Sequence, residues 1–585
     1  MKLLIKNLFV VIVAATFIAA CGSKSLKQAS LIPKDASAVF ILDQKAMKEK
    51  LKSGNFQMDS VINNLITSID SSKGKKLIKD WENSGINNEE KLVGFMTQSG
   101  GLKNQSMGVN FIVSLNDATK FEAFLKAQET FKTNTVAKGK LFTSMKIFDE
   151  GLISWTNEIA MFSFYHNNNS MPNFDIMDST LKMPEPAAKI DLMAIVEKYY
   201  SLKDADKMSS VKQFNEMLNK KADAYMFSSS ASIGNTLSML PFQVPKLEEL
   251  LKDNYTAAYV NFENGKIVMN ATTFLNDRLT SLLKQYGNGS VKLSMLENFP
   301  AKNVNAAMLM SFKPEMIGGI LKELQLETLI DAGLSSQKLN FNLQDIYKCM
   351  KGDLAVAIGD FEIKSNPADP NVEANKPSMK ILFNAEVGDK ISLNKILDQA
   401  VKMQFLINTT GVYTVNPAMA AGSPVYLRID DKNIIVASDE STYTQYAAKT
   451  TKASFSKDFT NDLSGKYCAM YVNVNSFLTA FMSATNNDET AKKIMDKALA
   501  TFDDGVVTCE NIKDGKVSGT GYLKMKNEKE NSLVSLANFT KYCVEEGVKM
   551  TKENKNKVEV TDLNLEHLKQ ENFKEPLPPT PPAKY

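Results

Sequence analysis

Apolar residues along the chain follow two patterns, which predict short strands and amphipathic helices. Residues 37–43 follow a Pro-Lys-Asp-Ala turn and are mostly apolar, which is typical of a buried strand. Residues 109–115 form another apolar run, and Asn116-Asp117 after it favour the start of a helix. Apolar residues at helical spacing between positions 121 and 125 extend that helix. Together with hairpins predicted at turns, these patterns indicate an α+β protein.

The same succession of elements is predicted twice along the chain. The paired features begin at Pro33 and Pro300, at Ile112 and Leu382, at Asp149 and Asp430, and at Gly265 and Gly515. Their offsets are 267, 270, 281 and 250 residues. We therefore expect two similar tandem halves, residues 31–292 and 293–546, each an antiparallel sheet with packed helices, from a diverged duplication. The alternative is that any α+β chain repeats strands and turns in this way.

The first thirty residues have the pattern of an export signal. Lys2 and Lys6 precede an apolar run of about thirteen residues, which is shorter than the roughly 20 residues of a spanning helix. Small residues then precede Cys21. We expect residues 1–20 to be a signal peptide and residues 21–30, which are small and polar, to be a tether. The alternatives are an uncleaved anchor or an ordinary signal peptide with a chance cysteine.

Two other segments are polar and rich in proline. Residues 364–378 separate two predicted strands and contain Pro, Asn and acidic residues. Residues 547–585 are polar, and five of the last ten residues are proline. We expect an exposed insertion at the first and an extended or disordered tail at the second.

The net charge excludes one class of partner. The 585 residues carry 69 basic and 66 acidic side chains. Removal of residues 1–20 takes away two lysines and leaves a net charge of +1. A charge so close to zero gives no field that would attract nucleic acid.

The cysteines beyond the tether allow one favoured pairing. They are Cys349, Cys468, Cys509 and Cys543. Cys468 and Cys509 both lie in strand-like stretches, so a disulfide is expected there before any other place. The alternative is that all four are buried free thiols.

The sequence offers no recognisable catalytic, cofactor-binding or metal-binding residues. Its two histidines, His166 and His567, have no partner histidine, which argues against a zinc site or a serine–histidine–aspartate triad. Phosphate-binding and nucleophile-elbow motifs are absent from the sequence. Adjacent carboxylates at Asp430-Asp431 and Asp503-Asp504 fall in predicted turns, where a structural role is favoured over glycoside hydrolysis.

Three features resemble known bacterial lipoproteins. Ile18-Ala19-Ala20-Cys21 resembles a lipobox, which implies that Cys21 is lipidated and becomes the first residue of the mature protein. The Ile-Pro-Lys-Asp-Ala start at Ile32, and the segment Gly85 to Glu89, are similar to those of a Bacteroides-type lipoprotein family, a domain of unknown function. The resemblance supplies no catalytic residues. The lack of acidic residues after Cys21 favours a body that faces the periplasm.

We therefore expect a lipid-anchored envelope protein, at the outer membrane, that binds a protein or polymer partner without being an enzyme. One alternative is a glycan or peptide hydrolase that uses carboxylates, for which two acids should face each other about 5–10 Å apart. Another is a carrier of a small apolar ligand, which an apolar cavity would favour. A flat, partly apolar patch would favour the binding protein.

Overall fold

The computed structural model describes most of the chain between residues 26 and 550. The described ranges are 26–56, 79–99, 105–168, 173–175, 180–182, 190–231, 244–287, 289–363, 377–418, 425–461, 463–484, 489–547 and 549–550. The signal peptide, Cys21, the insertion at 364–376 and the tail beyond residue 550 lie outside these ranges.

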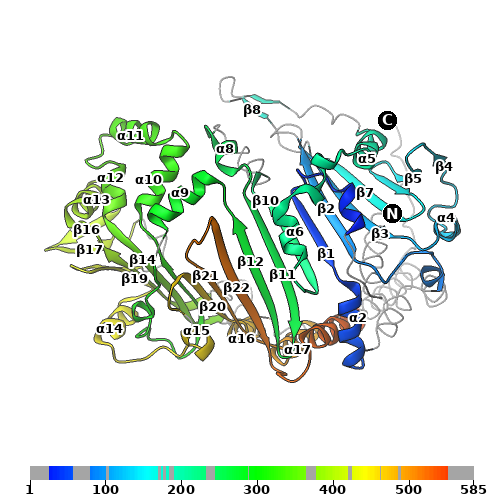
Figure 1. Cartoon of the computed structure of the whole chain (residues 1–585). Helices are drawn as coiled ribbons and strands as arrows, with labels where there is room; N and C mark the ends of the chain where they lie inside the picture. Colours follow the sequence, from blue (N-terminus) through cyan, green and yellow to red (C-terminus); the bar gives the residue numbers. More distant parts are fainter. Residues whose placement is uncertain are drawn as a thin grey trace, which may run out of the picture.

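The fold is α+β, as the sequence predicts, and it is built on one antiparallel sheet of 18 strands (Figure 1). Pairing in the first half runs β4–β5–β6–β7–β3–β2–β1–β10–β11–β12. The strands are β1 (Ala38–Leu42), β2 (Leu92–Ser99), β3 (Gln105–Ser114), β4 (Val136–Lys138), β5 (Thr143–Phe148), β6 (Gly151–Trp155), β7 (Ile159–Asn168), β10 (Ala224–Ser229), β11 (Tyr255–Glu263) and β12 (Lys266–Phe274).

The second half follows the order β18–β19–β15–β14–β13–β20–β21–β22. Its strands are β13 (Val304–Ser311), β14 (Met350–Ile363), β15 (Pro377–Val387), β18 (Tyr426–Ile429), β19 (Asn433–Ala437), β20 (Lys466–Asn473), β21 (Phe502–Glu510) and β22 (Lys516–Met525). Two separate hairpins are β8 (Asn173–Asp175) with β9 (Thr180–Lys182), and β16 (Leu406–Thr409) with β17 (Val412–Val415).

The strand order β6–β7–β3–β2–β1–β10–β11–β12 of the first half is repeated strand for strand in the second. The last strands of the two halves, β12 and β22, pair with each other antiparallel, with Asn270 opposite Thr520, and so join the halves into one sheet. A common origin of the halves stays a prediction.

One expected equivalence is wrong. The β18–β19 hairpin at Asp430 occupies the place of the β6–β7 hairpin, because β19 pairs with β15 as β7 pairs with β3. The hairpin at Asp149 joins β5 and β6, so it precedes the β6–β7 hairpin in the chain and is not the equivalent of the hairpin at Asp430. The hairpins at Gly265 and Gly515 join β11 to β12 and β21 to β22, and they hold the same place in the two halves.

Several of the helices begin at side chains that cap them. Asp117 accepts hydrogen bonds from the backbone N–H groups of Thr119 and Lys120, and Asp389 accepts one from Ser392 at the equivalent helix of the second half. The helices are α2 (Gln44–Ser53), α4 (Ala118–Ala127), α5 (Leu192–Tyr200), α6 (Lys212–Leu218), α8 (Leu247–Leu251), α9 (Asp277–Tyr286), α10 (Glu315–Glu323), α11 (Glu327–Ser336), α12 (Leu343–Lys348), α13 (Lys390–Lys402), α14 (Glu440–Ala448), α15 (Lys457–Asn461), α16 (Val474–Ala484), α17 (Glu489–Leu499) and residues 532–547.

Helices of both halves cover one face of the sheet, which we call the covered face. Phe214 of α6 is fully buried against Phe227 of β10, and their rings meet edge to face. Phe459 of α15 is also fully buried, against Tyr471 of β20, and these two rings are tilted by 39°. Each half thus has its own core on this face.

The last helix of each half packs on the other half. Leu282 of α9 shares a cluster with Ile320 of α10, and the added Cβ of a residue at Gly319 would lie 2.6 Å from Leu282 Cδ2. Residues 532–547 pack through Leu533 and Val534 on Met47 and Leu51 of α2. In Figure 1 these two helix groups lie at opposite edges of the sheet, α9 and α10 above and α2 below. The two halves are therefore interleaved.

Candidate functional site

The second face of the sheet, which we call the open face, carries large apolar side chains in its middle. Phe40 on β1 lies directly opposite Met226 on β10. Met470 on β20 lies opposite Val507 on β21. Met269 on β12 lies two strands beyond Val507, with Gly521 of β22 between them. Residues that are opposite each other in an antiparallel pair point to the same face. We call Phe40, Met226, Met269, Met470 and Val507 the apolar strip.

All five side chains of the apolar strip are exposed, although each lies within a strand. The exposed fractions are 40% for Phe40, 43% for Met226 and Met269, 42% for Met470 and 39% for Val507. Their neighbours along the strands, such as Ile41 and Ala469, are fully buried on the covered face. The expectation that residues 37–43 form a buried strand is therefore right for alternate residues only.

Small residues separate the two ends of the apolar strip. Ala258 and Ala271 continue the row from Met226, and Gly519 and Gly521 follow on β22. A Cβ added at Gly521 would lie 3.2 Å from a methyl group of Val507, so the side chain of Val507 lies next to the backbone of Gly521. From Phe40 on β1 to Met470 on β20 the strip crosses six strand spacings, which corresponds to roughly 29 Å.

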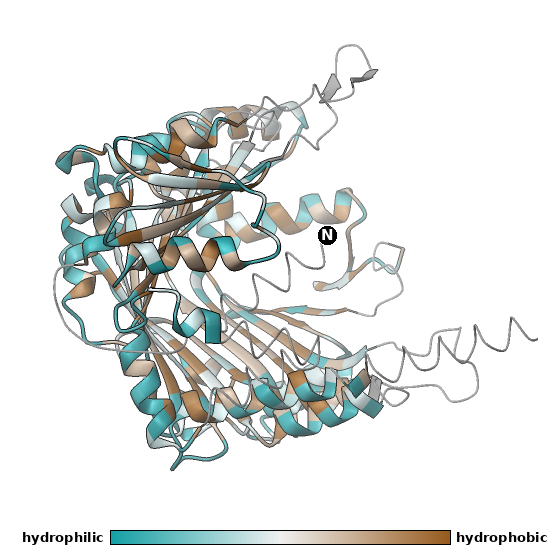
Figure 2. Cartoon of the chain, turned by 90° about the vertical axis from the view of Figure 1, so that its right-hand side faces the viewer, coloured by the Kyte–Doolittle hydropathy of each residue, from teal (hydrophilic) through white to brown (hydrophobic). Residues whose placement is uncertain are grey.

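Amphipathic helices border the open face but leave its middle uncovered in the described ranges. The cluster around Met47 and Val534 contacts Leu42 and Phe262, whose side chains point to the open face at one end of their strands. Near the outer edge, Phe121 of α4 covers Phe162 of β7 on the same face. In Figure 2 the helices carry both teal and brown residues, as expected of helices with one apolar side.

Cys468 and Cys509 lie on the open face beside the apolar strip. They are directly opposite each other on β20 and β21, and Cys509 is in turn opposite Gly519. Both are free and half-buried, so neither the expected disulfide nor the alternative of fully buried thiols describes them. A hydrogen bond from Cys468, followed by one from Tyr467 and the charge of Lys466, lowers the pKa of Cys509 to about 6, although burial opposes this.

A pocket with a volume of about 980 Å³ lies where β14, β15 and α16 meet. Two of its three acids are held by lysines: Lys380 Nζ lies 3.1 Å from Asp360, and Lys526 Nζ lies 2.5 Å from Asp503. Burial raises the pKa of Asp360, but the Asn303 N–H and the Lys380 ammonium outweigh it and lower the pKa overall. Asp360 therefore stays ionised and cannot serve as the protonated acid that glycoside hydrolysis requires.

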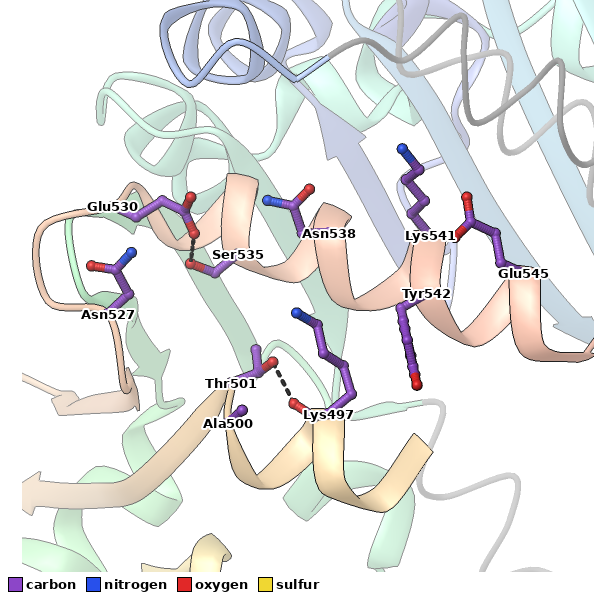
Figure 3. Close-up of a pocket in the computed structure, with 10 residues that line it drawn as sticks. All are labelled: Lys497, Ala500, Thr501, Asn527, Glu530, Ser535, Asn538, Lys541, Tyr542 and Glu545. Atoms are coloured by element: carbon purple, nitrogen blue, oxygen red, sulfur yellow. Dashed lines mark hydrogen bonds between the residues drawn. The ribbon is translucent and has the colours of Figure 1, made fainter. Parts of the chain in front are cut away.

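The second pocket, of about 430 Å³, lies between α17 and residues 532–547 (Figure 3). Glu530 accepts a 2.5 Å hydrogen bond from Ser535, and Lys497 lies 5.9 Å from the centre of the Tyr542 ring. Lysines and glutamates alternate around it, so neither sign of charge dominates. Its lining residues are Lys497, Ala500, Thr501, Asn527, Glu530, Ser535, Asn538, Lys541, Tyr542 and Glu545.

The adjacent carboxylates singled out in the sequence have structural partners. Asp430 Oδ1 accepts hydrogen bonds from the N–H groups of Lys432 and Asn433, which is the turn role expected of it. The Lys390 ammonium, 2.6 Å from Asp431, lowers the pKa of Asp431. Asp503-Asp504 are not in a turn, which corrects the expectation: they lie within β21.

Among the residues that the structure describes, no group of three or more histidine, cysteine or acidic residues is placed to hold a metal ion. His166 Nδ1 lies 3.2 Å from an oxygen of Glu150, and both side chains are exposed. His567 lies outside the described ranges. In the same part of the chain, the helices are too short or too polar for a membrane span.

Comparison with protein families and with curated proteins finds no match. Among solved structures, two crystal forms of TP0453 are similar to part of the chain. Form I has 10% sequence identity and a TM-score of 0.22, and covers 46% of this chain and 88% of its own. Form III has 9% identity and a TM-score of 0.23, and covers 46% and 89%. A similarity this weak carries no argument about function.

Proposed function

We propose that this chain is a lipid-anchored protein of the cell envelope that binds a partner protein on its open face, through an amphipathic helix of that partner. The observation that carries the proposal is the apolar strip, in which five large apolar side chains are exposed on the same face of one sheet, two of them at one end and three at the other.

The layer structure of the molecule supports a helix as the occupant. A sheet face with apolar side chains is stabilised when another layer covers it. On the covered face that layer consists of the chain's own helices, such as α6 and α15. The strip is roughly 29 Å long, which is the length of a helix of about 19 residues. A row of single side chains fits one apolar helix stripe better than it fits a lipid with several chains.

Three methionines in the strip suit a partner whose side chains interlock with the sheet. Met269, Met226 and Met470 have flexible thioether side chains that can adapt to the shape of a bound surface. The carrier alternative is less well supported, because the two pockets described above are lined largely by polar side chains. The hydrolase alternative is less well supported because the acids Asp360 and Asp503 are paired with lysines.

The binding proposal is tested by one lysine substitution in each half of the strip. Met226→Lys and Met470→Lys should each weaken recovery of a reproducible partner from detergent-solubilised envelopes by roughly tenfold or more, since a charge would be buried at the contact. Leu329→Lys on α11 is the matched control, because Leu329 is a 68% exposed leucine away from the strip. Equal recovery with all three variants would contradict the proposal.

The lipid anchor is tested separately. Cys21→Ser removes the thiol that lipidation requires, and should shift the protein from the membrane fraction to the soluble envelope fraction. Membrane retention of this variant, with no acyl label on the wild type, would contradict anchoring without affecting the binding test.

A further inference from the structure

Cys468 and Cys509 are placed so that a bond between them needs no movement of the sheet. They are opposite residues of the antiparallel pair β20–β21. Opposite residues in such a pair have Cα atoms about 4.5 or 5.5 Å apart, and a disulfide spans about 4.4–6.8 Å. The two Sγ atoms already share a hydrogen bond. The strand ladder holds both thiols in this arrangement without a covalent link.

The surroundings of Cys468 and Cys509 shift the pKa values of the two thiols in opposite directions. Cys509 is the thiol whose pKa is lowered, by Cys468 first and then by Tyr467 and Lys466, so it carries the negative charge near neutral pH. The hydrogen bond to Cys509, together with burial, raises the pKa of Cys468, which keeps its proton. One reactive thiolate beside one protonated thiol is the arrangement of a dithiol that exchanges with disulfides.

The other described cysteines lack this arrangement. Cys349 is 6% exposed, and burial raises its pKa. Burial also raises the pKa of Cys543. Neither has another cysteine opposite it in a strand pair of the described chain.

We propose that Cys468 and Cys509 form a redox-active dithiol, which disulfide compounds oxidise to a cross-strand disulfide on the open face. The Cys509 thiolate attacks one sulfur of a disulfide R–S–S–R, the S–S bond breaks, and one thiolate RS⁻ leaves. Cys468 then gives its proton to solvent and attacks the Cys509 sulfur of the mixed disulfide, which releases the second RS⁻. The two cysteines lose two electrons in total, and R–S–S–R gains them.

The position of Cys468 and Cys509 on the sheet leaves space for a disulfide to form between them. Cys509 faces Gly519, which has no side chain, and a Cβ built at Gly519 would lie 3.6 Å from Cys509 Sγ. The thiols are half-buried on the same face as Met470 and Val507, so a small disulfide can approach from solvent. The proposal does not depend on the partner proposed above.

The test uses the full chain with Cys21→Ser, which retains four cysteines. The protein is reduced, freed of reductant and treated with oxidised glutathione, and its peptides are mapped by mass spectrometry without reduction. We expect one cross-linked peptide pair that contains Cys468 and Cys509, with Cys349 and Cys543 still free, and complete reversal by dithiothreitol.

The serine variants separate the two roles. Cys468→Ser should stop the reaction at a glutathione adduct on Cys509, because the second attack cannot occur. Cys509→Ser should slow the modification of Cys468 relative to that of Cys509 in the wild type, because burial still raises the pKa of the Cys468 thiol. Failure of the wild-type chain to form the cross-link, or a cross-link that involves Cys543 or Cys349 instead, would overturn the proposal, and neither result depends on how the variants fold.

Discussion

At the scale of single residues, the molecule is organised by which face of the sheet a side chain points to. Neighbours along one strand have opposite environments: Ile41 is fully buried, and Phe40 is 40% exposed. Both are apolar, so the alternation that normally identifies a strand with one exposed face is hidden in the sequence. This is why the apolar strip could not be predicted.

Two substitutions in β1 measure this difference. Ile41→Ala should lower the free energy of unfolding by about 2–5 kcal/mol, since it leaves a cavity in the core. Phe40→Ala should change it by less than about 1 kcal/mol, because much of the ring is already in water. Urea unfolding of both variants provides the measurement, and an equal loss in both would show that the face at Phe40 is covered.

Asp345 connects stability to acid pH. Its carboxylate accepts hydrogen bonds from the Asn342 N–H, the Ser392 hydroxyl and the Lys395 ammonium. Burial raises its pKa, but these three groups outweigh burial and lower it overall. A lowered folded pKa adds stability above the unfolded value of about 3.9, and this stability is lost as pH falls through the folded pKa.

Asp345→Asn should therefore cost about 1–3 kcal/mol at neutral pH. The difference in unfolding free energy between wild type and variant should stay constant above about pH 5 and shrink below about pH 4. Denaturant unfolding at a series of pH values provides the test. A difference that grows as the pH falls would contradict the assignment.

At the scale of elements, much of the fold could be predicted from the sequence. The helix capped by Asp117 and the hairpins at Gly265 and Gly515 are where turn and capping residues place them. Such features depend on local chemistry. Asp503-Asp504 were expected in a turn, but the pairing of Asp504 with Asn473 of β20 overrides the turn preference of aspartate.

Features that depend on distant contacts could not be predicted. The β12–β22 pair and the packing of residues 532–547 on α2 join residues more than 200 positions apart. The sequence predicts that Cys468 and Cys509 both lie in strands, but it does not predict that they are opposite each other. The register of a strand pair is set by the whole sheet.

The contact between α9 and α10 provides a test at this scale. Gly319→Leu should destabilise the protein by about 1–3 kcal/mol, because Leu282 occupies the space that the new side chain needs. Gly333→Leu on α11 is the matched control, since no atom lies within 4 Å of an added Cβ there. It should be neutral or stabilising by up to about 1 kcal/mol. Thermal unfolding of both variants distinguishes a real helix contact from a loose one.

At the scale of the whole molecule, the two halves form one structure. One sheet crosses both of them, and each half places its last helix on the other. We therefore expect a single cooperative unfolding transition, in which the calorimetric enthalpy equals the van't Hoff enthalpy. Two separate transitions in a calorimetric scan would indicate that the halves are independently stable.

The central claim is that the apolar strip on the open face contacts a partner protein, and cross-linking tests it most directly. A photoreactive amino acid at position 470 places the probe in the strip, and the same probe at position 329 provides the control. After irradiation of intact envelopes, we expect position 470 to form one adduct that maps to an amphipathic helix of another protein, and position 329 to form none. Adducts from position 470 with lipid or with this chain itself, or equal capture at both positions, would contradict the account.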